Sequence, residues 1–231
     1  MSILKRFRIT NFSYSWSPLS YFTVVMIVVW FPLAKILPPQ IGWENGFLEN
    51  LQVVVLALGQ FACIYTYIKH RTKVSLGVAS LMGLAIGREL SWGRVFRPTG
   101  LYNAEGPLFF DYPPAAHLAI QILVAIWVML TLWLLLTNIH WEQVWQVKFP
   151  LIPFLLMAAC TLIQYTAEHN PKTLFSLNEP QWQIVEEEME LLIYLNFIVF
   201  IYRYMFAVQK LLVRTSKLNV FCHNPYSDSK A

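Results

Sequence analysis

The residues best placed for chemistry in this chain are glutamates grouped in one short stretch near the C-terminal third. Glu186, Glu187, Glu188 and Glu190 lie within five consecutive positions. On a helix, Glu186 and Glu190 are neighbours at i and i+4, and Tyr194 continues the face that carries Glu187 and Glu190. Carboxylates this close repel one another unless a cation, a metal ion or protonation compensates them. The stretch therefore predicts a carboxylate-rich site.

Two further groups of polar residues interrupt apolar segments earlier in the chain. Glu49, Gln52 and Gln60 fall on one helical face, because eleven residues at 100° each return to within about 20° of the starting direction. Arg88 and Glu89 are adjacent in a segment that is otherwise apolar. Ionisable residues inside long apolar segments usually face a bundle interior and mark a site. We therefore expect Glu49 and Glu89 to act as general bases or metal ligands and Arg88 to bind an anion such as phosphate.

Other polar and aromatic residues are expected to line the same cavity. These residues are Gln52, Trp92, Arg94, His117 and Tyr194. Carboxylate and imidazole ligands suit divalent ions such as zinc, manganese, iron or magnesium. A divalent metal site is accordingly one hypothesis, with the ligands drawn from Glu49, Glu89, Glu187, Glu190 and His117.

Each of these signals also has a purely structural explanation. Glutamates at a helix N-terminus are stabilised by the helix dipole, which would account for Glu44, Glu186 and Glu188. Arg88 could form an ion pair with Glu89 or a later glutamate and so hold helices together. His117 follows two prolines at a helix start, where an interfacial histidine hydrated by water is the alternative.

Composition identifies the medium in which these residues lie. The chain has 231 residues, of which 57% are hydrophobic and 13% charged, with a mean hydropathy of +0.49. A soluble domain carries about 25% charged residues, so an integral membrane protein of the all-α class is predicted. Three scattered cysteines exclude a disulfide framework. Six stretches are long enough to cross a hydrocarbon core of about 30 Å: 18–38, 43–68, 74–93, 114–137, 149–168 and 184–208.

The distribution of charge predicts how these segments cross. Most of the 17 lysines and arginines fall in the segments that are cytoplasmic if the N-terminus is inside, whereas all but two of the 13 acids fall on the other side. We therefore expect a cytoplasmic segment 1–17, a six-helix domain 18–208 and a cytoplasmic tail 209–231, in the inner membrane of a bacterium. The net charge of +4 then reflects topology and not a nucleic-acid partner. The expected partners are membrane lipids and either a membrane protein or a second copy.

Two features concern the packing of these elements. Ala79, Gly83 and Gly87 recur at four-residue spacing, which lets helix backbones approach closely and predicts that the third segment is the central helix. The segment 94–113 is the longest loop and is rich in glycine, proline and aromatic residues. Such a loop is expected to lie on the membrane surface as a lid or re-entrant cap.

Three segments together resemble a family of bacterial multi-pass inner-membrane proteins of uncharacterised activity. They are Trp43-Glu-Asn-Gly-Phe-Leu-Glu49, Gly87-Arg-Glu-Leu-Ser-Trp-Gly-Arg-Val-Phe96 and Glu186-Glu-Glu-Met-Glu190. The family's Gly-Glu-Glu-Ile-Ser-Trp-Gly-Gln-Arg-like motif is matched here at Glu89, Ser91, Trp92 and Gly93, and its earlier glutamate at Glu49. Arg88 replaces the family's first glutamate, and only Arg94 remains of its Gln-Arg pair. A third family segment is matched loosely by Asn103, Glu105 and His117. If two adjacent acids bind metal in the family, Arg88 argues against that here.

The resemblance implies no activity, and standard catalytic motifs are absent from the sequence. Three hypotheses remain. The first is a membrane-embedded enzyme that acts on a lipid or lipid-linked substrate in a cavity open to the extracytoplasmic side. The second is a non-enzymatic binding or assembly subunit of a membrane complex. The third is a small solute or proton-coupled transporter, disfavoured because no internal repeat is present.

Overall fold

The computed structural model describes residues 12–103, 106–139, 141–144, 146–169 and 177–222, and most of these residues are helical. Three helices are long and apolar enough to cross a membrane: α2 (Phe47–His70), α4 (Pro114–Asn138) and α6 (Leu151–His169). The predicted helical class is therefore confirmed. Two small sheets, each of two short strands, accompany the helices because loop backbones at the two ends of the bundle pair with each other.

The remaining elements complete the chain order. The helices are α1 (Pro18–Ala34), α3 (Lys73–Glu89), α5 (Trp141–Val144) and α7 (Glu179–Cys222), and the 3-10 turns are η3 (Pro39–Ile41) and η4 (Ser91–Phe96). The strands are β1 (Phe12–Ser13), β2 (Pro98–Asn103), β3 (Gly106–Phe109) and β4 (Phe149–Pro150). Strand β1 pairs in parallel with β4, and β2 pairs antiparallel with β3. Each range predicted to span coincides largely with one of the helices α1, α2, α3, α4, α6 and α7.

Local capping explains where two of these helices begin. Ser17 and Ser20 form a capping box ahead of α1, with Pro18 in its first turn. At α7, the Asn178 side chain accepts from the Gln181 N–H, while the Gln181 side chain accepts from the Asn178 N–H. Helix α7 therefore begins at Glu179, ahead of the predicted start at residue 184. It also continues to Cys222, so the predicted boundary at residue 208 falls inside one helix.

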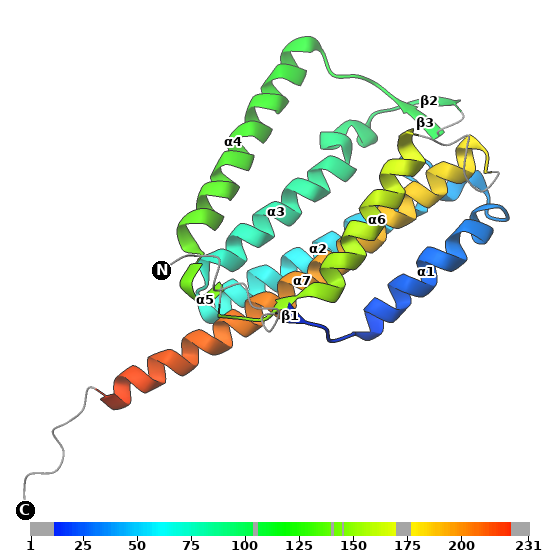
Figure 1. Ribbon diagram of the computed structural model, residues 1–231. Coiled ribbons are helices and arrows are strands. Elements are labelled where there is room, and N and C mark those ends of the chain that lie inside the picture. Colours follow the sequence, from blue (N-terminus) through cyan, green and yellow to red (C-terminus); the bar gives the residue numbers. More distant parts are fainter. Residues whose placement is uncertain (1–11, 104–105, 140, 145, 170–176, 223–231) are drawn as a thin grey trace, which may run out of the picture.

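The long helices run side by side, and α7 is the most central of them (Figure 1). Helix α7 packs against α1, α2 and α6, whereas α3 lies between α2 and α4. The expectation that the third segment is central is therefore wrong. Its small residues serve a narrower purpose: a side chain at Gly83 would meet Gln60 of α2 at 2.8 Å and Trp127 of α4 at 3.0 Å. Gly83 therefore permits the close approach of α2 and α4 to α3.

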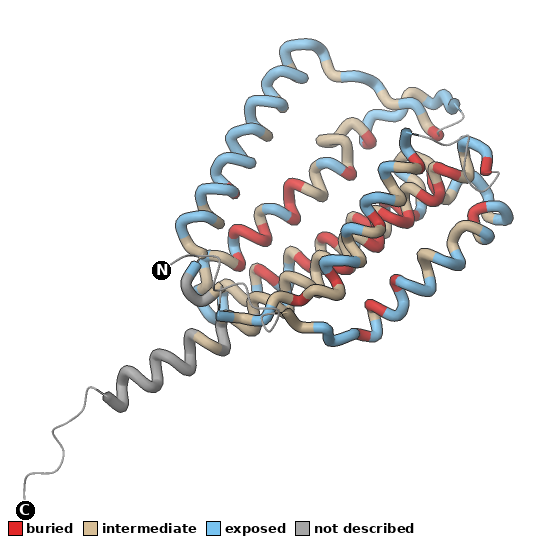
Figure 2. The backbone as a smooth tube through the Cα atoms, viewed as in Figure 1, coloured by how far each residue is buried: buried red, intermediate tan, exposed pale blue. Residues whose placement is uncertain are grey.

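The core follows α7 through the bundle. Ile184, Val185, Met189 and Leu192 of this helix are completely buried. Figure 2 shows buried residues along α2, α3 and α7 and an almost wholly exposed α4. In a chain of this composition, an apolar helix with little protein contact is suited to face lipid. The central position of α7 means that its glutamates enter a region surrounded by other helices.

The segment predicted to form a lid is a turn followed by a hairpin. Strands β2 and β3 pair Tyr102 with Pro107 and Asn103 with Gly106. A side chain at Gly106 would meet Trp43 at 2.8 Å, so the hairpin packs against the loop that precedes α2. The hairpin lies at the end of the bundle opposite β1 and α5 (Figure 1). We call this end of the bundle the hairpin end. We call the opposite end the basic end, because it carries Lys69, Arg71, Lys73, Lys148 and Arg203.

Candidate functional site

Arg88, in the last turn of α3, is the centre of a hydrogen-bonded network near the hairpin end. Its Nε and Nη2 donate to Glu89 Oε1 at 3.0 and 2.8 Å. The same Nη2 lies 2.7 Å from Glu190 Oε2 and 3.0 Å from the Tyr194 hydroxyl, both on α7. Tyr194 in turn donates to Glu89 Oε1 at 2.5 Å. The two carboxylates and the phenol thus share one side of the guanidinium.

The burial of these groups is unequal. The Arg88 side chain is 57% exposed, whereas those of Glu89 and Glu190 are 5% and 13% exposed. The carboxylates therefore lie behind the cation, inside the bundle. Nη1 of Arg88 makes no hydrogen bond to the part of the chain that the structure describes, so it is available to an acceptor from outside.

Two glutamine side chains, one from α6 and one from α2, donate to glutamates of α7. Gln164 of α6 donates to Glu190. Gln52 of α2, which is completely buried, donates from Nε2 to the Glu187 backbone carbonyl at 2.8 Å and to Glu187 Oε2 at 2.9 Å. The Arg88 network consequently joins α3, α6 and α7, and the separate Gln52–Glu187 pair joins α2 to α7. Gln164 is not among the residues predicted from the sequence, although a lone amide in an apolar segment can indicate a site inside a helix bundle.

Glu49 has a different role from the one expected. It is buried, and its Oε2 accepts from the backbone N–H of Asn45, just before the start of its own helix. This contact closes the turn before α2, and Glu49 lies in the first turn of that helix, so the helix-dipole explanation offered for Glu44 applies to Glu49. Glu49 still lies close enough to Glu187 and Glu89 for electrostatic repulsion. It borders the network without bonding to Arg88.

The metal hypothesis is not supported by the arrangement of the side chains. Within the described residues, no three His, Cys, Asp or Glu side chains are placed to hold one ion. Glu89 and Glu190 are occupied by Arg88, Glu187 by Gln52 and Glu49 by Asn45. His117 is exposed in the first turn of α4 and makes no side-chain contact with a described carboxylate. The five proposed ligands therefore do not converge.

Arg94 lies outside the network. Its guanidinium nitrogens lie 3.4 Å from a Glu44 carboxylate oxygen and 3.5 Å from an Asp111 carboxylate oxygen, and so connect the loop before α2 to the segment before α4.

The dipole explanation for Glu186 and Glu188 is wrong, because α7 begins two turns before them. Glu188 is 2% exposed and faces away from Arg88, without a hydrogen bond to a described residue.

The matched Ser-Trp-Gly motif forms a tight reversal after α3. Ser91, Trp92 and Gly93 have φ values of 43°, 54° and 94°, all in the left-handed region. This turn folds the Trp92 ring back over Gly87, where a Cβ would lie 2.4 Å from the indole. Glycine at 87 is therefore needed for the close approach. The reversal places Trp92 beside Arg88, where both line the same pocket. The centroid of the Trp92 ring lies 6.4 Å from that of Trp127 in α4.

An apolar groove of about 460 Å³ ends at this network. It runs between α3 and α7 with one contribution from α2. Its apolar lining consists of Leu56, Leu81, Met82, Leu84, Ala85, Ile193 and Phe197. Arg88, Tyr194 and Trp92 also line it. Of the cavity residues predicted from sequence, Trp92 and Tyr194 thus line the groove. Gln52 is buried against Glu187, and Arg94 and His117 lie outside both the groove and the network.

Comparison of the chain with protein families, with curated proteins and with solved structures found no match. The resemblance carried by the Glu-Leu-Ser-Trp-Gly core is therefore still an expectation. Glu105, part of its loosest segment, lies outside the described residues.

Proposed function

We propose that this chain is a six-span protein of a bacterial inner membrane, with both ends in the cytoplasm. Helices α1 and α3 have 17 residues each, or about 25 Å at 1.5 Å per residue, close to the thickness of a hydrocarbon core. Helix α7 crosses with its acids in the outward half. The basic end is cytoplasmic, because lysine and arginine are enriched in cytoplasmic loops.

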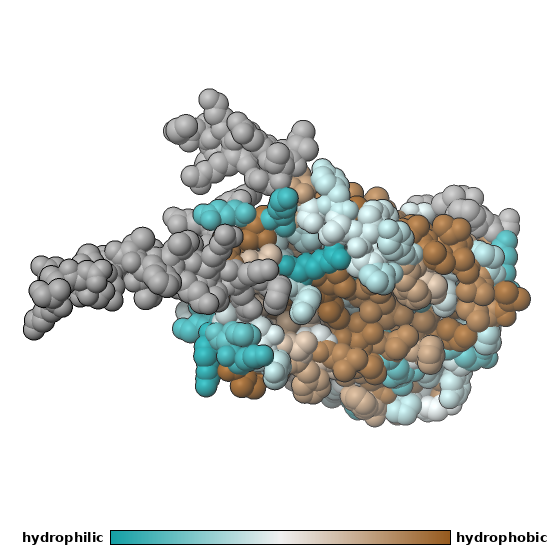
Figure 3. Space-filling view, turned by 90° about the horizontal axis from the view of Figure 1, so that it is seen from below, coloured by the Kyte–Doolittle hydropathy of each residue, from teal (hydrophilic) through white to brown (hydrophobic). Residues whose placement is uncertain are grey.

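The support for this orientation comes from where the described charges gather. Lys69, Arg71 and Lys73 lie at or beside the connection between α2 and α3, which is at the same end of the bundle as β4 and α5 (Figure 1). Lys148 directly precedes β4 and lines one pocket with Arg203. Figure 3 shows hydrophilic residues gathered on the left of this face, next to a broad hydrophobic surface. The basic residues expected at positions 5, 6, 8 and 230 lie outside the described part of the chain.

Cysteine labelling tests the orientation. In a background with Cys63, Cys160 and Cys222 replaced by serine, a cysteine at Asn103 in the hairpin is expected to react with an impermeant maleimide on intact spheroplasts. A cysteine at Arg71 is expected to react only after lysis. Labelling of Arg71→Cys but not Asn103→Cys in intact spheroplasts would reverse the orientation.

Within this topology, we propose that the groove binds a membrane lipid or lipid-linked molecule. The observation that carries this proposal is the continuity of an apolar channel with the half-exposed guanidinium of Arg88. An acyl chain fits the apolar wall, and Nη1 of Arg88 can donate to an ester or phosphate oxygen at the polar end. Because Glu89 and Glu190 lie beside Arg88, a zwitterionic headgroup fits the local charge better than a strongly anionic one.

Binding is favoured over catalysis because the carboxylates are already engaged. Glu89 and Glu190 are held by Arg88, and a base that is bonded to a guanidinium is a poor proton acceptor. One observation favours an enzyme as the second candidate: the Tyr194 hydroxyl lies 2.5 Å from Glu89 and borders the groove, as a proton relay would. In that case Arg88, Glu89 and Tyr194 would carry the reaction.

Filling the groove tests the binding proposal. Ala85→Phe adds a ring to the groove wall and is expected to reduce the lipid that co-purifies with the protein about tenfold, as measured by mass spectrometry of extracts. Ile86→Phe is the matched control, since Ile86 is the next residue of α3 and does not line the groove. Equal lipid retention in both variants and the wild type would remove the proposal.

A further inference from the structure

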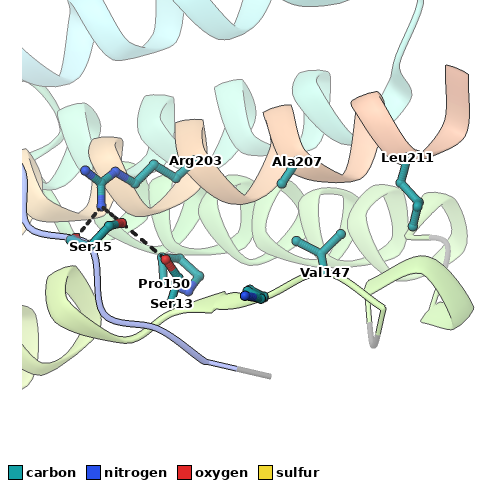
Figure 4. Close-up of a pocket in the computed structure, with 8 residues that line it drawn as sticks. Ser13, Ser15, Val147, Pro150, Arg203, Ala207 and Leu211 are labelled. Carbon is teal, nitrogen blue, oxygen red and sulfur yellow. Dashed lines mark hydrogen bonds between the residues drawn. The ribbon is translucent and has the colours of Figure 1, made fainter. Parts of the chain in front are cut away.

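A second pocket lies at the basic end, away from the Arg88 network. It has a volume of about 580 Å³ and lies between the β1–β4 pair and the cytoplasmic half of α7. The lining residues are Ser13, Ser15, Val147, Lys148, Pro150, Arg203, Ala207 and Leu211. Arg203, Ala207 and Leu211 share one face of α7 and point toward the strand segment that carries Val147 and Pro150 (Figure 4).

The charged groups that line this pocket are Arg203 and Lys148, and both are hydrogen-bond donors. Arg203 Nη1 donates to the Ser15 carbonyl at 2.8 Å and to its hydroxyl at 3.1 Å, which fixes the guanidinium at the pocket wall. Its Nε and Nη2 make no hydrogen bond to a described residue, and neither does the exposed Lys148 ammonium. None of the described residues that line the pocket is acidic. Two positive charges therefore line the pocket, and no described residue of its lining supplies a negative one.

The surroundings add an apolar flank. Phe149 stacks edge-on with Phe154 and Phe200, at centroid distances of 5.4 and 5.3 Å. The Tyr204 ring lies 6.2 Å from Phe149, and its hydroxyl donates to the Val144 carbonyl at 2.9 Å. Aromatic rings with one polar tip are typical of the membrane–water interface. The pocket thus lies at headgroup depth in the proposed topology.

From this combination, we propose that the pocket binds the phosphate group of an anionic ester, held by Arg203 and Lys148. Arginine binds phosphate through parallel N–H donors, and lysine adds a point charge. The apolar flank and the position at headgroup depth favour an anionic phospholipid of the cytoplasmic leaflet as the source. The inference rests on the membrane topology proposed above but not on the groove at the opposite end.

Lipid titration of the purified full-length protein in detergent tests the site. Dioctanoyl phosphatidylglycerol is expected to bind about tenfold more tightly than dioctanoyl phosphatidylcholine. The choline group of phosphatidylcholine carries a positive charge, which Arg203 and Lys148 repel. Lys148→Gln is expected to weaken phosphatidylglycerol binding about tenfold. Arg203→Lys keeps the positive charge but loses the paired N–H donors of the guanidinium, and is expected to weaken binding about threefold. Lys73→Gln removes the same charge at the same end outside the pocket and is expected to change binding less than twofold.

The alternative results are distinguishable. Competition by glycerol 3-phosphate at equal concentration would support the phosphate site and assign it to a soluble ester, whereas its failure to compete supports the lipid. Equal weakening by Lys73→Gln and Lys148→Gln would overturn the site in favour of a diffuse surface effect. Equal affinity for the two lipids would also overturn it. Arg203→Lys guards against loss of folding, because it retains a donor for Ser15.

Discussion

Replacing Arg88 by glutamine is expected to lower the free energy of unfolding by about 3 kcal/mol, well beyond the effect of Glu89→Gln. Loss of the guanidinium leaves Glu89 and Glu190 buried without a shared cation, which is the costly way to break an ion pair. In Glu89→Gln, Arg88 keeps Glu190 and Tyr194, and the new amide still accepts a hydrogen bond. That variant is expected to lose about 1 kcal/mol.

The comparison is made by SDS titration of the purified variants in mixed micelles, followed by tryptophan fluorescence. The triple variant Arg88→Gln, Glu89→Gln, Glu190→Gln carries no charge in the network and is expected to recover to within about 1 kcal/mol of the wild type. Glu188→Gln is the control, because Glu188 is a buried glutamate of α7 that has no described hydrogen-bond partner to lose. If Arg88→Gln is no less stable than Glu188→Gln, the network contributes nothing to the fold.

Replacing Gln52 by methionine is expected to cost about 2 kcal/mol. Gln52 is completely buried, and its amide is the described donor to both the carboxylate and the backbone carbonyl of Glu187. Hydrogen bonds to charged groups contribute about 1.5–3 kcal/mol, and an orphaned carboxylate also retains its desolvation penalty. Methionine preserves the volume, so the loss reports on the hydrogen bonds and not on a cavity.

Gln60→Met provides the matched comparison on the same helix. Gln60 donates at 3.1 Å to the Ala79 carbonyl, a neutral acceptor, so its replacement is expected to cost about 1 kcal/mol. Adding Glu187→Met to Gln52→Met removes both partners and should recover most of the lost stability. Equal losses of stability in Gln52→Met and Gln60→Met, with no recovery in the double variant, would show that the hydrogen bond from Gln52 to Glu187 adds no special stability to the fold.

The helices were predictable because their signals are local. Apolar runs of membrane length and turn residues such as Pro113 and Pro114 specify a helix without reference to distant contacts. The start of α7 was misplaced by five residues, because the cap formed by Asn178 and Gln181 precedes the apolar run. That error in turn produced the wrong explanation of Glu186 and Glu188 as helix-terminal acids.

By itself, the sequence determined the helical class, the approximate helix ranges and the fact that carboxylates gather near Arg88, since each follows from composition and from periodicity along one helix. Only the tertiary structure decided which carboxylate bonds to which donor. The rotation of α7 brings Glu190 to Arg88 and Glu187 to Gln52, whereas it turns Glu188 away. The central position of α7, the exposure of His117 and the reversal at Trp92 likewise depend on how separate helices and turns pack, and spacing along a single segment contains no information about that.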